Sequence, residues 1–174
     1  FDGQRSTVDV LIRNDDVAGA TFTPTTLNVL EGDQVSYAVT LKSEPQANVT
    51  ISRDGQSLTF TANNWDKAQT MTFAAPEDDA QQGPQAVQLD HTVSSGDAGY
   101  DGLTPDKVSV LVVDNDTPGV LLSSTVVDVA EGGKTGAYAV NLTSPPSAPV
   151  TVAFVGGGQL AVEPGTLTFN SSNW

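Results

Sequence analysis

Apolar and polar residues alternate along most of this chain, which is the pattern of β-strands that have one buried and one exposed face. The clearest case is the segment 35–42, where every second residue from Val35 to Leu41 is apolar and the residues between them are small or polar. Similar but shorter patterns recur along the chain. The pattern predicts strands at about 20–30, 35–42, 48–53, 57–61, 69–75, 86–94 and 107–113.

Turn-forming residues separate these segments, as in Glu31-Gly32-Asp33 and Ser95-Gly96-Asp97. Every stretch long enough for a helix is interrupted by glycine, proline or β-branched residues. The segment 108–113 is apolar on both faces, as expected of a strand that is covered on each side or lies between modules. Seven or so short strands with turns about every 8–12 residues are typical of an antiparallel β-sandwich of immunoglobulin type. We therefore predict an all-β fold.

The chain also repeats itself, with a spacing that drifts from 99 to 109 residues. This period is longer than a solenoid repeat and fits one small domain per repeat. We expect the last strand of a preceding domain in 1–16, a complete domain in 17–116 and the first half of a following domain in 117–174. The matched blocks include Phe1-Asp2-Gly3 with Tyr100-Asp101-Gly102, Asn14-Asp15-Asp16 with Asp114-Asn115-Asp116, Glu31-Gly32 with Glu131-Gly132, Leu58-Thr59-Phe60 with Leu167-Thr168-Phe169, and Asn64-Trp65 with Asn173-Trp174.

Composition narrows the function classes. The net charge of −14 and the isoelectric point of about 4.1 argue against nucleic acid, whose phosphates require clustered Lys and Arg. No apolar run reaches the about 18 residues of a membrane span. The absence of cysteine excludes disulfides and thiol catalysis. Tandem modules of this composition favour an extracellular or cell-surface setting, in which bound metal is the usual replacement for disulfides.

Three acidic clusters carry the chemistry of the complete domain. They follow the first, fifth and seventh predicted strands, so in a sandwich of alternating strands they should meet at one end. Carboxylates gathered in this way repel one another unless a cation neutralises them. Oxygen ligands without His or Cys favour calcium, although acidic turns also occur simply because they keep a surface soluble. The clusters are Glu31, Glu77-Asp78-Asp79 and Asp114-Asn115-Asp116.

The order of these motifs resembles the Calx-β family, which is named for the calcium-binding domains of sodium–calcium exchangers and also occurs in integrin β4 and in long, repetitive adhesion proteins. The resemblance covers essentially the whole chain, as one full and two partial copies. It implies that calcium ligands come from Glu31, from Asp78 and Asp79 with Glu77 as a further candidate, and from Asp114 and Asp116. The motifs that carry it are Glu31-Gly32, Leu58-Thr59-Phe60, Gln69 to Phe73 leading to Glu77-Asp78-Asp79, and Val108 to Val112 closing on Asp114-Asn115-Asp116.

Two departures from the family pattern predict weak binding. Where strong binders continue the loop with more glutamates, this chain has Gln81-Gln82-Gly83-Pro84-Gln85, and Asn115 replaces a carboxylate, although its amide oxygen can still coordinate. Fewer charges imply affinity nearer the millimolar values of extracellular modules. Asn14-Asp15-Asp16 and Glu131 lack partner clusters in this chain, so we expect no metal there.

Other candidate sites are weaker. His91, the single histidine, is in phase with its apolar neighbours and reads as a buried structural residue, and no triad can be built around it. Trp65 would suit a sugar platform, but its recurrence as Trp174 favours a packing role. Paired carboxylates such as Asp78 and Asp79 lack any sign of a substrate cleft, so we predict no enzyme activity. N-glycosylation sequons begin at Asn48, Asn115, Asn141 and Asn170.

The sequence therefore predicts a structural and adhesive module of a long surface or filament protein, in contact with neighbouring repeats of the same chain and stiffened by calcium at its junctions. The short connection Thr117-Pro118-Gly119 supports this, because three residues with a proline leave little freedom between modules. A second hypothesis is an adhesion module that binds a glycan or protein ligand. The least favoured is a regulatory calcium sensor of the exchanger type.

Overall fold

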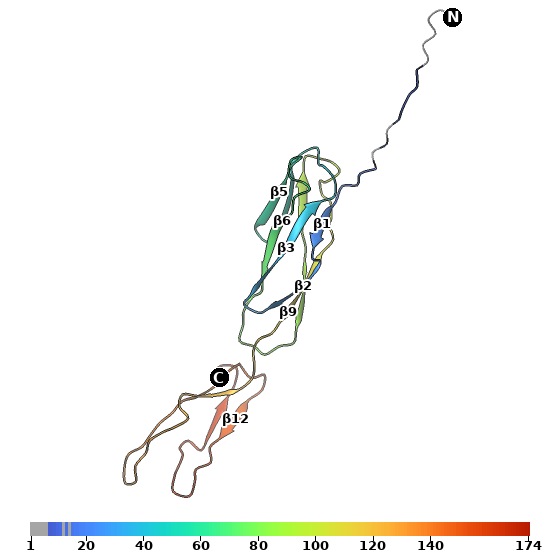
Figure 1. Ribbon diagram of the computed structural model, residues 1–174. Coiled ribbons are helices and arrows are strands. Elements are labelled where there is room, and N and C mark those ends of the chain that lie inside the picture. The colour runs from blue at the N-terminus through green and yellow to red at the C-terminus, as the bar shows by residue number, and fades with distance from the viewer. Residues whose placement is uncertain (1–6, 12, 14) are drawn as a thin grey trace, which may run out of the picture. The chain divides into compact units, whose positions relative to one another are not determined.

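The computed structural model describes residues 7–11, 13 and 15–174, and over these residues the protein is built from strands and loops with no helix. This confirms the all-β prediction. Five small sheets are formed, with strand orders β1-β3-β6, β5-β4-β8, β2-β9-β7, β10-β11 and β12-β13. The strands are β1 (Ala20–Thr23), β2 (Thr26–Leu30), β3 (Gln34–Leu41), β4 (Val49–Arg53), β5 (Gln56–Phe60), β6 (Gln69–Ala74), β7 (Gln85–Leu89), β8 (Thr92–Ser95), β9 (Val108–Val113), β10 (Val120–Leu122), β11 (Val140–Leu142), β12 (Val150–Ala153) and β13 (Thr166–Phe169) (Figure 1).

The described residues divide into two compact units. Unit 1 comprises the chain up to Thr25 together with Ser36–Thr72 and Gln88–Val108, and unit 2 comprises Thr26–Val35, Phe73–Val87 and Ser109–Trp174. Sheet β5-β4-β8 and most of sheet β1-β3-β6 belong to unit 1. Most of sheet β2-β9-β7 and both two-stranded sheets belong to unit 2.

The core of unit 1 follows from the alternation read in the sequence. In β3, Tyr37, Val39 and Leu41 are buried while Ser36 is exposed, as the period of two predicts. Tyr100 is also buried in unit 1, and its hydroxyl is hydrogen-bonded there. The Tyr100 hydroxyl donates to the backbone oxygen of Ser43 at 2.6 Å and lies 2.9 Å from its Oγ. The polar tip of Tyr100 is therefore satisfied inside the core.

Two of the predicted strands are wrong as single elements. The segment 20–30 breaks after Thr23, where Pro24 has no N–H to donate to a ladder, and continues as β2. Its first part, β1, pairs antiparallel with β3, whereas β2 pairs in parallel with β9. The segment 86–94 likewise separates into β7, next to β9, and β8, next to β4. A purely antiparallel arrangement is therefore also wrong.

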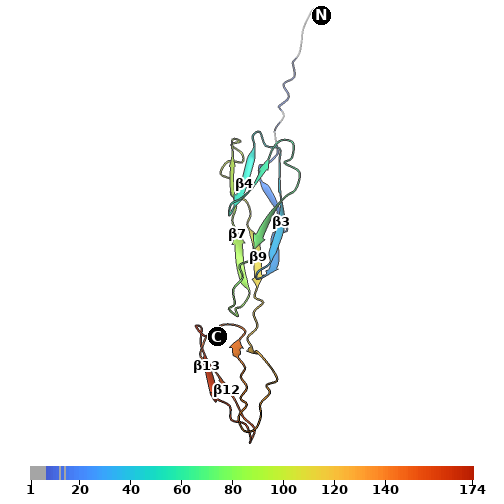
Figure 2. The ribbon, with the colours of Figure 1, turned by 90° about the vertical axis from the view of Figure 1, so that its left-hand side faces the viewer.

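The three-stranded sheet that is mostly in unit 2 carries two of the predicted acidic clusters at its strand ends. It has β9 at its centre, with β2 on one side (Figure 1) and β7 on the other (Figure 2). Val110 and Val112 of β9 are buried, but Leu111 on the opposite face is 37% exposed. The first of the two expectations for this strand, that both of its faces are covered, is therefore wrong at Leu111. The second, that the strand lies between modules, stays a prediction. A separate small core of unit 2 contains Val140, Leu142 and Phe169, with Trp174 packed against it.

Recurring sequence blocks form the same local structure in both places. Val49 pairs with Phe60 in β4 and β5, and Val150 pairs with Phe169 in β12 and β13. The Oδ1 of Asn64 accepts a hydrogen bond from the Thr61 N–H at 2.6 Å, and Asn173 does the same for the Asn170 N–H at 2.6 Å. The division of the chain into a complete domain at 17–116 and the first half of a following domain at 117–174 stays a prediction.

The segment predicted as the last strand of a preceding domain, 1–16, falls partly outside the described residues, because 1–6, 12 and 14 are not included. The block Phe1-Asp2-Gly3 and Asn14 of the first acidic triplet thus lie outside them. The described residues of this segment form no strand. No helix suited to crossing a lipid bilayer is present in the described part of the chain.

Candidate functional site

The parallel pairing of β2 and β9 determines where two of the acidic clusters lie. Leu30, the last residue of β2, is paired with Val113, the last residue of β9. The Glu31 N–H then donates to the Val113 backbone oxygen at 3.0 Å, which extends the ladder by one step. Since both strands run in the same direction, Glu31 and Asp114 emerge at the same end of the sheet.

The third cluster is brought to this end by the turn after β2. The Ala75 N–H, just beyond β6, donates to the backbone oxygen of Asp33 at 2.8 Å. Gly32 in this turn has a φ of 76°, a left-handed conformation that favours glycine. A Cβ on Gly32 would collide with a carboxylate oxygen of Glu77, so the turn and the acidic loop lie against each other.

The carboxylates of Glu31, Asp114 and Asp116 form the centre of the site. Each offers one oxygen, and the three oxygens lie within 4.8 Å of one another. All three residues are half-buried. Two oxygens, Glu31 Oε2 and Asp116 Oδ2, are enclosed and have no hydrogen-bond partner. A buried acceptor without a donor is costly, and either a hydrogen-bond donor or a bound cation would satisfy these two oxygens.

The remaining predicted ligands lie around this centre. The Asn115 amide nitrogen donates to the Glu31 backbone oxygen at 3.0 Å and to Glu77 Oε2 at 3.4 Å, so in this arrangement it is a donor rather than an oxygen ligand. Glu77, Asp78 and Asp79 are exposed. The structure therefore gathers all three clusters at one end, with Glu31, Asp114 and Asp116 closest together.

Gln82 is the residue of the site that the sequence reading missed. Its N–H donates to Asp114 Oδ2 at 2.8 Å, and its side-chain Nε2 donates to both carboxylate oxygens of Asp78, at 3.1 and 2.9 Å. Gln82 thus ties the loop after β6 to the loop after β9. The sequence analysis noted Gln82 only because it stands where strong binders have a glutamate. A side-chain amide close to carboxylates can donate hydrogen bonds to them.

Partial burial and the charges of neighbouring carboxylates raise the pKa values of Glu31 and Asp116. Partial burial, followed by the charges of Asp78 and Asp114, raises the pKa of Glu31 above its ordinary value of 4.5. Partial burial and the charge of Asp114 likewise raise the pKa of Asp116. Every charged neighbour that shifts these two groups is itself a carboxylate. In the absence of a cation, the fully ionised cluster therefore destabilises the fold.

This repulsion predicts a pH dependence. The folded state takes up a proton on Glu31 at a higher pH than the unfolded state does, so stability should rise as the pH falls from 7 through the folded pKa towards 4.5. Glu31→Gln should remove the part of this gain that comes from Glu31, while Asp116, whose pKa is also raised, keeps its own part. Urea unfolding of both proteins in EDTA at pH 7 and pH 5 measures the difference between them. An identical pH response in the two proteins would contradict the repulsion.

The donor set fits a hard cation such as calcium. The three central side chains are all carboxylates, the charge is strongly negative, and two enclosed oxygens have no donor from the protein. Glu31, Asp114 and Asp116 would hold such an ion, and Glu77 and Asp78 lie close enough to act on Glu31 electrostatically. A bound divalent ion would attract the carboxylates of all three acidic clusters and so offset the repulsion among them.

The turn that supports the site gives a second prediction. Gly32→Ala should cost about 1–3 kcal/mol, because it forces a left-handed φ on alanine, and it should also displace Glu77. Gly55→Ala is the matched control, since Gly55 has a φ of 80° but open space around its Cβ position. Chemical denaturation compares the two variants. An equal loss of stability in both would show that the contact with Glu77 contributes nothing.

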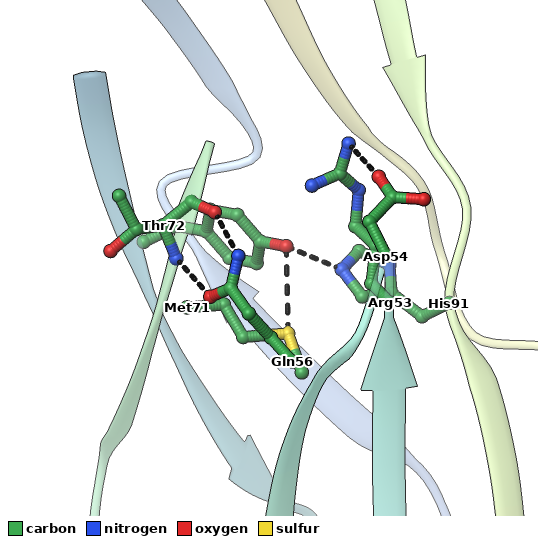
Figure 3. Close-up of polar contacts among 7 residues, drawn as sticks. Arg53, Asp54, Gln56, Met71, Thr72 and His91 are labelled. Atoms are coloured by element: carbon green, nitrogen blue, oxygen red, sulfur yellow. Dashed lines mark hydrogen bonds and ion pairs between the residues drawn. The ribbon is translucent and has the colours of Figure 1, made fainter. Parts of the chain in front are cut away.

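His91 lies in the core of unit 1, as predicted. Its Nε2 is 2.7 Å from the Tyr37 hydroxyl, which also contacts the Met71 sulfur at 3.6 Å (Figure 3). The Phe22 ring lies against the imidazole with 4.4 Å between centroids. Burial, with a smaller contribution from the Arg53 charge, lowers the pKa of His91 below 6.5. His91 is therefore a buried residue that packs against aromatic rings and shares a hydrogen bond with the Tyr37 hydroxyl.

The other predicted sites are at the surface or between it and the core. Trp65 is half-buried, and its backbone oxygen accepts the Leu41 N–H at 2.9 Å. The four sequon asparagines, Asn48, Asn115, Asn141 and Asn170, are all exposed.

Comparison with known proteins gave no match, either to a protein-family model or to a curated protein.

Proposed function

We propose that this chain is a structural and adhesive part of an extracellular or cell-surface protein, built from Calx-β-like modules and stiffened by calcium. The observation that carries the proposal is the cluster of Glu31, Asp114 and Asp116, with oxygens within 4.8 Å of one another. Two of its oxygens are enclosed and without a partner. A cation is the simplest group that satisfies both the charge and these oxygens.

The place of the cluster in the chain supports a role at a junction. Asp116 is followed directly by Thr117-Pro118-Gly119 and then by β10. Thr143 secures this connection, because its Oγ1 donates to the Thr117 oxygen at 2.6 Å and its N–H donates to the Gly119 oxygen at 3.0 Å. A cation held by Asp114 and Asp116 would restrict the residues just before the connection, while the hydrogen bonds of Thr143 restrict the connection itself.

The proposal includes no enzymatic role. It assigns the buried histidine to packing among aromatic and thioether side chains and the acidic cluster to cation binding. In this role the partners of the module are neighbouring repeats of the same chain. The calcium affinity would be weak, as in other extracellular modules, because glutamines stand at 81 and 82.

Small-angle X-ray scattering of the chain tests the stiffening. We expect the pair-distance distribution of the wild-type chain to be narrower in calcium than in EDTA. The reason is that a cluster neutralised by calcium restricts the connection at 117–119. The variant Asp114→Asn with Asp116→Asn should scatter alike in both buffers. The stiffening role is wrong if calcium leaves the pair-distance distribution of the wild type unchanged. It is also wrong if calcium narrows the distribution of the variant to the same degree.

A further inference from the structure

Two strands of the complete sandwich each have one edge that no other strand covers. β5 lies at the edge of sheet β5-β4-β8, and β6 lies at the edge of sheet β1-β3-β6. The two strands follow each other in the chain, but no backbone ladder joins them in the part of the chain that the structure describes. The outward N–H and C=O groups of such an edge can pair with a strand of another molecule.

Neither strand carries the residues that usually prevent this pairing. Folded proteins commonly protect an exposed edge with a charged side chain or a proline. The segments Gln56–Phe60 and Gln69–Ala74 contain no charged residue, no proline and no glycine. The second of them, with 6 residues, also has the length and composition of segments that stack into intermolecular sheets. Any protection of these two edges therefore comes from uncharged groups.

The side-chain amide of Gln56 occupies the backbone of Thr72 in β6. The Thr72 N–H donates to Gln56 Oε1 at 3.1 Å, and Gln56 Nε2 donates to the Thr72 backbone oxygen at 2.6 Å (Figure 3). In an antiparallel ladder, the two residues of a hydrogen-bonded pair exchange the same two bonds. The Gln56 amide therefore makes the contacts that a residue of an added strand would make.

A second glutamine acts in the opposite direction, from β6 to β5. Gln69 Nε2 donates to the Thr59 backbone oxygen at 2.9 Å. Asn64, in the loop between the two strands, donates to the same oxygen at 3.3 Å. The loop holds Asn64 in place, because the N–H and the hydroxyl of Thr61 both donate to its Oδ1, at 2.6 and 3.0 Å. An outward backbone group of β5 is thus also in use.

The turn before β5 fixes the position of Gln56. Asp54 and Gly55 have φ values of 45° and 80°, and Arg53 is paired with Gln56 across them. Positive φ at both central residues is the mark of a type I′ turn, which sets the register of a two-residue hairpin. The hairpin therefore places Gln56 at a defined position, from which its side chain reaches Thr72.

We propose that Gln56 and Gln69 seal the free edges of β5 and β6 against strand addition by a second copy of this chain. Both glutamines and the backbone groups that they bind lie in unit 1, so one compact unit forms the whole seal. The excluded partner is the same edge of another copy, because an edge paired with itself gives a self-complementary contact. None of these residues belongs to the acidic clusters, so the seal does not depend on calcium.

Amide hydrogen exchange at Thr72 tests the seal itself. In Gln56→Ala, the Thr72 amide should exchange faster by about tenfold or more, because its N–H loses its acceptor. The amide of Tyr37 in the adjoining strand β3 should keep its protection. The matched control is Gln34→Ala, at an exposed glutamine that begins β3, and it should leave Thr72 unchanged. Equal exchange at Thr72 in the wild type and in Gln56→Ala would overturn the proposal.

Analytical ultracentrifugation of the full chain over a range of concentrations tests the consequence. Gln56→Ala with Gln69→Ala should self-associate more tightly than the wild type by about tenfold or more, since both edges are then open. Adding Thr72→Pro should reverse this gain, because proline removes the outward N–H that an added strand requires. Association caused by misfolding would instead persist in the triple variant.

Three results in the ultracentrifuge would each overturn the proposal. The first is a double variant that sediments like the wild type at every concentration. The second is a Gln34→Ala variant that associates as tightly as the double variant. The third is association that Thr72→Pro fails to reduce.

Discussion

Calcium should raise the thermal stability of this protein, whereas magnesium should raise it less because magnesium requires a smaller, near-octahedral set of ligands. An ion that binds only the folded state adds RT ln(1 + [L]/Kd), which is about 2.7 kcal/mol when calcium is at about one hundred times its Kd. For a chain of this length, each kcal/mol corresponds to about 2–4 °C in the midpoint of unfolding. Differential scanning calorimetry in EDTA and in calcium measures the shift.

The control for this prediction is the pair of substitutions Glu31→Gln and Asp116→Asn. These amides keep the shape of the side chains but remove the charges of the two enclosed carboxylates. The variant should be at least as stable as the wild type in EDTA, since it removes two charges that partial burial and neighbouring carboxylates both disfavour. It should gain little from calcium. A calcium shift of the same size in the variant would place any bound ion elsewhere.

The second large effect is the loss of stability when an aromatic residue is removed from either of two cores, one around Phe60 and one around Phe169. Phe60→Ala should destabilise the protein by about 3–5 kcal/mol, because Phe60 has no exposed surface and its loss leaves a cavity. Phe169 holds the same position opposite Val150 that Phe60 holds opposite Val49. Its core is smaller, with three buried residues, so Phe169→Ala should cost less and act only on the local cluster.

Native-state hydrogen exchange separates these outcomes by location. In Phe60→Ala, protection should fall at β4, β5 and β8 together, because these strands form one sheet. In Phe169→Ala, the loss should stay within β12 and β13. If Phe169→Ala lowers protection in β4 as strongly as Phe60→Ala does, the two cores are not energetically separate.

The sequence predicted the convergence of the acidic clusters for a partly wrong reason. It counted 20–30 as one strand in an alternating sandwich, whereas the chain breaks at Pro24 and β2 then runs parallel to β9. Alternation shows which residues face a core, but it does not show which sheet a strand joins. That choice depends on partners distant in sequence. Glu31 still meets Asp114, because parallel neighbours end on the same side.

Local patterns were more reliable where the structure is local. The alternation in β3 was correct, because it depends on a period of two within one strand. The burial of His91 was also correct, although His91 lies in the break between β7 and β8. Gln82 could not be assigned from sequence, since its role requires that it lie beside both Asp78 and Asp114, which is 32 residues further along the chain. A contact of that kind is set by the fold.

A calcium titration followed by NMR chemical shifts tests the central claim most directly. The account predicts that saturable shifts occur at the amides of Glu31, Asp78 and the segment 114–116, while the amides of Glu131 and of β4 stay in place. The same titration of Glu31→Gln with Asp116→Asn should leave the 114–116 amides unmoved. Wild-type spectra that do not change with calcium, or that change only at sites away from these loops, would contradict a cation bound by these carboxylates.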